Sequence, residues 1–368
     1  MRALPVSLFD TATPLEPLRE RLHAAAAQVL DSGRYILGPE VAAFEHELAD
    51  HLGVRHVVGV ANGTDALSLA LMGMGVGPGD DVVVPSFTFY ASVEAIADLG
   101  ARPVFCDVDP DTACVTPQAV SAALTADTKA VVTVDLFGNV APNEEIEALG
   151  VPVLEDAAQA AGSVAADGRP GALGTAATFS FFPSKNLGAF GDGGAITTSD
   201  DGIAERVRML RFHGSRDKTT FELIGHNSRL DEMQAAILRV QLPHLEGWAD
   251  GRRRAAEHYR DEGLGELVDL PVPVDGCEPA WHLYVVRHER ADDLAAALKA
   301  AGIGQKAYYR VPTHEQPAMR DFAPAGELPG TAEVARTHLA IPMSPVLSRK
   351  QAAEVVAAVR DAGLGRPH

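Results

Sequence analysis

Lys185 is placed where a side chain could carry out covalent chemistry. A β-rich run ends at Pro183, and a glycine-rich stretch of residues 186–194 follows the lysine. Ligand sites in open α/β sheets lie at the carboxyl ends of strands. Partial desolvation of a lysine there favours the neutral amine, which attacks aldehydes. The alternative is an exposed loop lysine, because lysines are mostly exposed.

A carboxylate lies at the end of a second apolar run. Residues 151–155 read as a buried strand, and Asp156 falls at its carboxyl end. An acid there can pair with the ring nitrogen of a bound heterocycle, and Gln159 can approach the same ring. Glu155 is the weaker candidate because alternate residues of a strand face opposite ways. A helix N-cap is the alternative role for Asp156.

The third element is a turn that suits a phosphate group. In Val60-Ala61-Asn62-Gly63-Thr64-Asp65 a strand ends, a small-residue turn follows and a helix begins. Backbone N–H groups at a helix N-terminus bind anions, so we expect Gly63 and Thr64 to bind phosphate, with the Thr64 hydroxyl as a further donor. Ser180 supplies a second hydroxyl near the predicted site. An ordinary helix cap is the alternative.

A flat ring also needs an aromatic face to stack on. Phe87 follows the strand that ends at Pro85 and is our candidate for that role. Core packing is the alternative, and the sequence does not decide between the two.

Short apolar runs and helical patterns alternate over the first two-thirds of the chain. The runs are unbroken, which is typical of strands buried on both faces of a parallel sheet with helices on both sides. We predict seven strands, at residues 57–60, 81–85, 102–108, 129–136, 151–155, 177–182 and 193–197. Helices are expected between most of them, and also at 15–31, 39–52, 232–242 and 251–260. Strand 281–287 and helices 292–301 and 350–362 predict a smaller α+β domain at the end of the chain.

Composition restricts the partners. The chain has 31 Lys and Arg against 50 Asp and Glu, a net charge of −19, which disfavours nucleic-acid and acidic membrane surfaces. No stretch approaches the roughly 20 apolar residues of a membrane span. Three widely spaced cysteines make neither a disulfide framework nor a zinc site, and we expect no metal. A cytoplasmic protein is the simplest expectation.

These elements follow one another along the chain as phosphate turn, aromatic residue, acid and lysine, with the lysine 29 residues after the acid. This order is typical of one enzyme family. The chain resembles the DegT/DnrJ/EryC1/StrS sugar aminotransferases over nearly its whole length, from residues 33–40 to 311–317. The stretches 178–195 and 225–238 carry the resemblance most specifically. It implies a pyridoxal-5′-phosphate (PLP) enzyme of fold type I, with a large domain over 1–245 and a small domain over 246–368. It also implies that Lys185 holds the cofactor as a Schiff base while Asp156 keeps the ring protonated.

The resemblance further implies a homodimer with shared active sites. Asn227 would reach the phosphate of the partner's cofactor, and Arg229 and His314 would contact a nucleotide-sugar. From the residues alone, Asn227 and Arg229 merely precede a helix and are equally compatible with capping.

The implied reaction is transfer of an amino group from L-glutamate to a nucleotide-linked keto sugar. The loop after Lys185 looks like that of enzymes that aminate C3 of dTDP- or UDP-linked 3-keto sugars. Phe182 departs from the pattern, because many such enzymes have a tyrosine there. Two alternatives stay open: a 4-keto-sugar or inosose aminotransferase, and a non-catalytic PLP-binding sensor.

Overall fold

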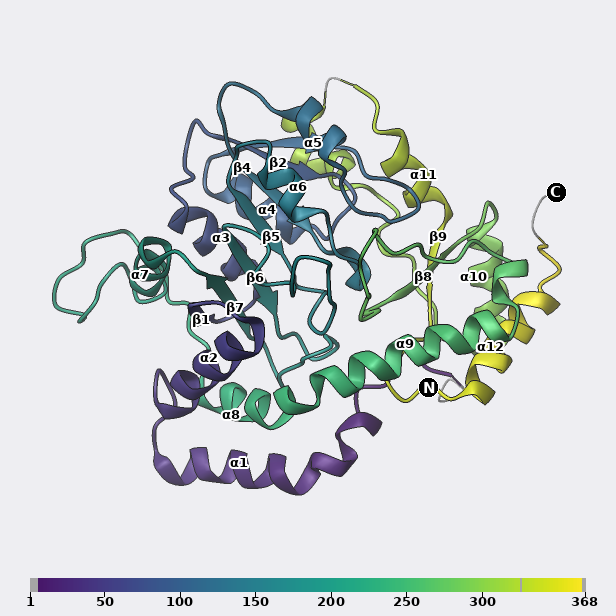
Figure 1. Cartoon of the computed structure of the whole chain (residues 1–368), viewed down its shortest axis with the longest axis horizontal. Coiled ribbons are helices and arrows are strands. Elements are labelled where there is room, and N and C mark those ends of the chain that lie inside the picture. Colours follow the sequence, from purple (N-terminus) through teal and green to yellow (C-terminus); the bar gives the residue numbers. More distant parts are fainter. Residues whose placement is uncertain (1–5, 325, 366–368) are drawn as a thin grey trace.

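The computed structural model describes residues 6–324 and 326–365. Its main element is a seven-stranded sheet in the spatial order β1-β7-β6-β5-β4-β2-β3 (Figure 1). β7 runs antiparallel to its two neighbours, and the other adjacent strands are parallel. The prediction of a mainly parallel seven-stranded sheet is confirmed. The strands are β1 (His56–Val60), β2 (Asp81–Pro85), β3 (Arg102–Cys106), β4 (Thr128–Val134), β5 (Val153–Asp156), β6 (Ala176–Ser180) and β7 (Gly194–Thr198).

Both faces of this sheet are buried, as the unbroken apolar runs predict. In β1, Val57 packs into one apolar cluster while Val58 packs into another. The same division separates Ala195 from Ile196 in β7. Successive strand residues point to opposite faces, so a separate layer covers each side. The described helices of this part are α1 (Arg19–Ser32), α2 (Pro39–Leu52), α3 (Gly63–Gly73), α4 (Ala91–Asp98), α5 (Pro117–Ala123), α6 (Asn143–Glu147), α7 (Asp201–Leu210) and α8 (Glu232–Gln241).

Side-chain caps fix where several helices begin. Asn62 accepts a hydrogen bond from the backbone N–H of Asp65 and so starts α3. Asp231 starts α8 in the same way. These oxygens satisfy N–H groups that have no partner inside the helix. The Asn62 cap, just beyond the carboxyl end of β1, therefore aims the N-terminus of α3 at one edge of the sheet.

A second apolar core lies toward the end of the chain. It packs around the two-stranded antiparallel sheet of β8 and β9 and includes Tyr259 and Val355. Val6, near the start of the chain, packs into the same core. Its elements are α9 (Leu245–Asp261), β8 (Tyr284–Arg287), α10 (Ala291–Ala300), α11 (Pro329–Thr337), β9 (His338–Ile341) and α12 (Arg349–Asp361).

α9 connects the two cores as one continuous helix (Figure 1). Leu245 packs with the apolar cluster on one face of the large sheet, while Tyr259 belongs to the second core. The predicted boundary at residues 245/246 therefore falls at the start of this helix and stays a prediction. We expected the helix to begin at Gly251, but it begins six residues earlier. A Cβ at Gly251 would lie 2.2 Å from the Pro345 carbonyl oxygen, so close packing explains this glycine.

Within residues 6–324 and 326–365, no helix has both the length and the apolar character that a membrane crossing requires.

Candidate active site

A cavity of about 680 Å³ opens at the carboxyl ends of β5 and β6. One side, which we name the strand-end wall, comes from segments that follow strands of the large sheet. The other, which we name the second wall, comes from the N-terminal segment and from residues 282–309. The strand-end wall comprises Gly63, Thr64, Phe89, Asp156, Gln159, Ser180 and Lys185, and the second wall comprises Phe9, His282, Lys306, Tyr308 and Tyr309.

Lys185 presents its amine to this cavity. Burial lowers the pKa of the amine from 10.5 to about 8, and the charge of Asp156 opposes that shift. A larger fraction of the amine is therefore neutral near pH 7–8 than for an exposed lysine. A neutral amine is the form that attacks a carbonyl carbon or accepts a proton.

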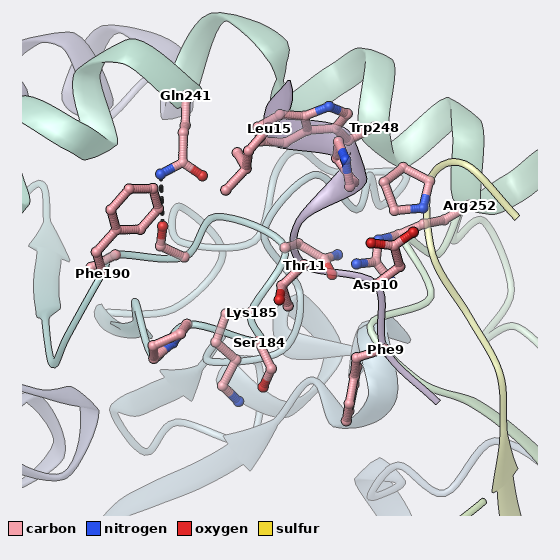
Figure 2. Close-up of a pocket in the computed structure, with 16 residues that line it drawn as sticks. Phe9, Asp10, Thr11, Leu15, Ser184, Lys185, Phe190, Gln241, Trp248 and Arg252 are labelled. Atoms are coloured by element: carbon pink, nitrogen blue, oxygen red, sulfur yellow. Dashed lines mark hydrogen bonds between the residues drawn. The ribbon is translucent and has the colours of Figure 1, made fainter. Parts of the chain in front are cut away.

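Hydrogen bonds from neighbouring segments hold the lysine loop in place. Asn186 donates to the carbonyl oxygens of Ala161 and Ala280, at 3.1 and 3.2 Å. Gln241 donates to the carbonyl oxygen of Gly188 at 2.8 Å, the bond drawn in Figure 2. These bonds tie the loop to the segment after β5, to α8 and to the segment before β8. The position of Lys185 is thus set from three sides.

Asp156 occupies the carboxyl end of β5 and is buried. It accepts hydrogen bonds from the Ser92 hydroxyl at 2.8 Å and the Ala158 N–H at 3.2 Å. Burial raises the pKa of this carboxyl group, while both donors and Lys185 counter the rise. An ionised carboxylate here is best stabilised by a cation in the cavity.

Gln159 lines the cavity next to Asp156. Its side-chain oxygen accepts a hydrogen bond from the Phe137 N–H at 2.9 Å. With the oxygen occupied, the amide NH₂ group is the end left to donate, and the Tyr309 hydroxyl is one partner within its reach.

Glu155 faces away from the cavity, as strand alternation predicts. Its carboxylate accepts hydrogen bonds from the N–H groups of Gly171 and Leu173. Burial raises the pKa of Glu155 to about 7, and its carboxyl group lies beside that of Asp135. The two acids share a buried environment behind the sheet edge, which leaves Asp156 as the acid of the cavity.

Gly63, Thr64 and Ser180 meet at the N-terminus of α3. A Cβ at Gly63 would lie 2.7 Å from the Ser180 Cβ, so β6 and the helix start approach closely only because residue 63 is glycine. Two hydroxyl groups and the first free N–H groups of the helix thereby converge on one side of the cavity. This donor set fits a phosphate group.

Phe87 is not brought to the cavity. Its side chain is 1% exposed and packs edge-on against Phe137 and His338. Phe89 lines the cavity instead and is 54% exposed. Phe87 lies two residues beyond β2, and its ring fills the core, so core packing explains it.

Three other predicted residues lie outside this cavity. Asn227 is exposed and pairs through its backbone with Phe212, and the Arg229 guanidinium lies 6.0 Å from the Phe212 ring. His314 contacts the Ser86 hydroxyl at 2.5 Å. The segment that carries Asn227 and Arg229 follows the long loop beyond α7, which extends from the molecule in Figure 1. The predicted roles of these three residues stay predictions, because none of them lines this cavity of its own chain.

The second wall was missed from the sequence. His282 is buried, and its ring stacks on Phe9 with centroids 6.0 Å apart. Tyr309 contacts Phe89 across the cavity, with ring centroids 5.8 Å apart. Residues 9, 282 and 309 are distant in sequence and form no local motif, so only the fold brings them together. The aromatic pair at 308–309 in a loop-rich stretch was the one local signal.

Comparisons with known proteins agree with this geometry. A family model described as the DegT/DnrJ/EryC1/StrS aminotransferase family matches residues 17–360. A dTDP-3-amino-3,4,6-trideoxy-α-D-glucose transaminase from Streptomyces venezuelae is 47% identical over 97% of this chain and 96% of its own length. A UDP-N-acetyl-3-dehydro-α-D-glucosamine 3-aminotransferase from Acidithiobacillus ferrooxidans is 41% identical, covering 96% and 97%. The crystal structure of a DegT/DnrJ/EryC1/StrS aminotransferase from Brucella abortus superposes with a TM-score of 0.93 at 40% identity, covering 96% and 98%.

Proposed function

Because this chain belongs to the DegT/DnrJ/EryC1/StrS aminotransferase family, whose enzymes use PLP, we propose that it transfers an amino group from L-glutamate to C3 of a dTDP- or UDP-linked 3-keto sugar. The observation that carries the proposal is the convergence of an amine, an acid and a phosphate cradle on one cavity. Relatives whose names specify 3-amino or 3-keto sugars support the position of the reacting carbon.

The residues of the strand-end wall fit the cofactor. Thr64 and Ser180 would donate to its phosphate, and Asp156 would pair with its ring nitrogen. Phe89 would supply the aromatic face, and the Gln159 NH₂ group would donate to the ring. When bound, PLP supplies an electron sink for the bond-breaking at the amino-bearing carbon.

The protein's own contribution is to place a base and exclude water. The Lys185 amine would take the proton from the donor's Cα and later return a proton to the sugar carbon. Its lowered pKa keeps a usable fraction of the base neutral near pH 8. Asp156, fixed by two hydrogen bonds, supplies the negative charge that a cationic ring requires.

A second copy of the chain would complete each site. The loop after α7 exposes two large apolar side chains, Phe221 at 59% and Ile224 at 92%. Asn227 and Arg229 lie next to this loop and outside their own cavity. Exposed apolar groups beside polar ones are typical of an interface between proteins. In a cytoplasmic homodimer, this segment would reach the partner's phosphate cradle.

Mixing inactive variants tests the shared site. Lys185→Ala and Asn227→Ala homodimers should each be impaired, while a mixed dimer has one site that carries neither change. Partial recovery of turnover on mixing would support sharing. Absence of recovery, with mixed dimers shown by tagged co-purification, would refute it.

A half-reaction experiment tests the chemistry. The yellow purified enzyme is bleached with L-glutamate, and return of the absorbance is followed with a dTDP- or UDP-linked 3-keto sugar or its 4-keto isomer. Return with the 3-keto compound alone supports the proposal. Return with only the 4-keto compound keeps the enzyme class but refutes the position. Failure of glutamate to bleach the enzyme refutes the donor and favours the sensor alternative.

A further inference from the structure

The second wall contains a lysine that has no carboxylate partner among the residues the structure describes. Lys306 lines the cavity and is exposed, and the described part of the chain gives its ammonium no ion pair. Nearby cations behave differently: Arg287, Arg310 and Arg336 each pair with an Asp or Glu side chain. In a chain with a net charge of −19, a cation left unpaired beside a cavity is available to a ligand.

The position of this ammonium is fixed from two directions. The backbone of Lys306 exchanges two hydrogen bonds with Ala340 of β9, at 3.1 and 2.9 Å. Its ammonium lies 4.7 Å from the centroid of the Tyr308 ring, within cation–π distance. Tyr308 also lines the cavity. The lysine is therefore held as part of the wall, and binding an anion costs it less rotamer freedom than a free surface lysine would lose.

The two lysines of the cavity lining, Lys185 and Lys306, differ in their exposure to solvent. Lys185 is less exposed and lies beside Asp156, where the reacting carbon must sit. Lys306 lines the second wall and is exposed, so it can meet a substrate group that stays near the solvent. The remaining charged groups of the lining are the acids Asp65, Asp156 and Asp192. Lys306 is thus the cation available in this lining to an anionic group distant from the reaction.

We propose that Lys306, supported by the Tyr308 ring, binds the diphosphate of the nucleotide-sugar substrate. The inference rests on the proposed function, in which the sugar reacts at C3 and carries its diphosphate on C1, two ring bonds away. A diphosphate is a strong acceptor for an ammonium group, and such charge-assisted hydrogen bonds are among the stronger polar contacts. A carboxylate of the amino donor has the same chemistry, so the experiment separates the two anions.

Binding of dTDP, UDP and glutarate to the cofactor-loaded enzyme is measured by calorimetry. We expect Lys306→Met to weaken binding of the preferred nucleoside diphosphate roughly 5- to 20-fold, with glutarate unaffected. Lys306→Arg should retain most of the affinity. Lys299→Met removes the same charge from an exposed position of α10 and serves as the control.

Two variants of Tyr308 test the contribution of its ring. Tyr308→Phe keeps the ring under the ammonium and should bind the nucleotide as the unmodified enzyme does. Tyr308→Leu removes the ring and should weaken binding a few-fold. Rising salt should lower nucleotide affinity less steeply in Lys306→Met than in the unmodified enzyme, because one ionic contact is missing.

The outcomes separate this inference from the proposed function. If the unmodified enzyme binds neither dTDP nor UDP, the nucleotide-linked substrate is refuted. If it binds one of them and Lys306→Met binds it equally well, only the role of Lys306 is refuted. A loss confined to glutarate would also overturn the assignment, because the anion would then be a donor carboxylate.

Discussion

The two walls of the cavity differ in how far the protein satisfies its own polar groups. On the strand-end wall, Asp156 accepts two hydrogen bonds and the Gln159 oxygen accepts one. On the second wall, the buried Nδ1 of His282 has no hydrogen-bond partner within the described chain, and Lys306 has no carboxylate. Buried polar groups in folded proteins are nearly always paired. The acceptor oxygens of Asp156 and Gln159 are therefore fixed in advance, whereas His282 and Lys306 on the second wall are left for a ligand to complete.

This difference has a chemical interpretation. The cofactor is the same at every turnover, so its wall gains from acceptor oxygens that the protein already holds in place. The two substrates of a ping-pong transaminase occupy the same space in turn, and open donors on the second wall suit a ligand that changes. Four predictions test this division, beginning with the largest expected effect.

Loss of the lysine should abolish the reaction. Lys185→Ala removes the amine that binds the cofactor covalently and moves the proton, so we expect turnover to fall by at least about 10⁴-fold. Steady-state amino transfer from glutamate measures it, with Lys299→Ala as the surface control. Turnover within about tenfold of the unmodified enzyme would show that Lys185 is not the base.

Loss of the acid should cost less than loss of the lysine. Asp156→Asn removes the negative charge from the ring-nitrogen site and should lower kcat by about 10²–10³-fold. Glu155→Gln, one residue away on the opposite face, should stay within a few-fold when the folded protein is compared. Equal losses in both variants would mean that the strand end acts only through folding.

The lowered pKa of Lys185 predicts a gain in stability when the lysine is removed. Below pH 8 the folded cofactor-free protein holds a charged amine that burial disfavours, so Lys185→Met should be more stable by up to about 3 kcal/mol. Between pH 8 and 10.5 the folded state has released this proton while the unfolded state keeps it. The stability of the unmodified protein then rises with pH, and the difference should close.

Urea unfolding of both cofactor-free proteins at pH 7, 9 and 10.5 measures this effect. A difference that does not change with pH would point to packing instead of charge. Lys299→Met controls for the lost charge.

The smallest effect is expected on the second wall. Phe9→Ala removes the ring that stacks on His282, and we expect the KM for the sugar substrate to rise about 3- to 10-fold. PLP affinity, measured by absorbance titration, should not change. A matching loss of PLP affinity would mean that the two walls are not separate in function.

The strand-end wall could be predicted from the sequence, and the second wall could not. The strand-end residues lie in short motifs at the ends of apolar runs, and parallel strands bring such ends together. Gly63, Thr64, Asp156, Gln159, Ser180 and Lys185 could therefore be placed on one cavity from local patterns. Phe87 and Phe89 could not be distinguished, because both follow the same strand and only packing decides which ring is buried.

The second wall could not be predicted from the sequence, for a physical reason. Phe9 and His282 are more than 270 residues apart, and neither side chain has a local pattern that implies the other. Tertiary contacts alone create their stack. The sheet, by contrast, was predictable because each buried strand has its own unbroken run of apolar residues.

The path of the chain between the two cores limits how the protein can be divided. α9 runs unbroken from one core to the other, and Val6 returns from the start of the chain to pack into the second core. A fragment made by one cut near residue 245 would lack either α9 or Val6. Expressed separately, the two pieces should fold poorly and re-associate when mixed. Limited proteolysis of the intact enzyme should accordingly trim exposed loops, such as the one after α7, before it releases a small domain.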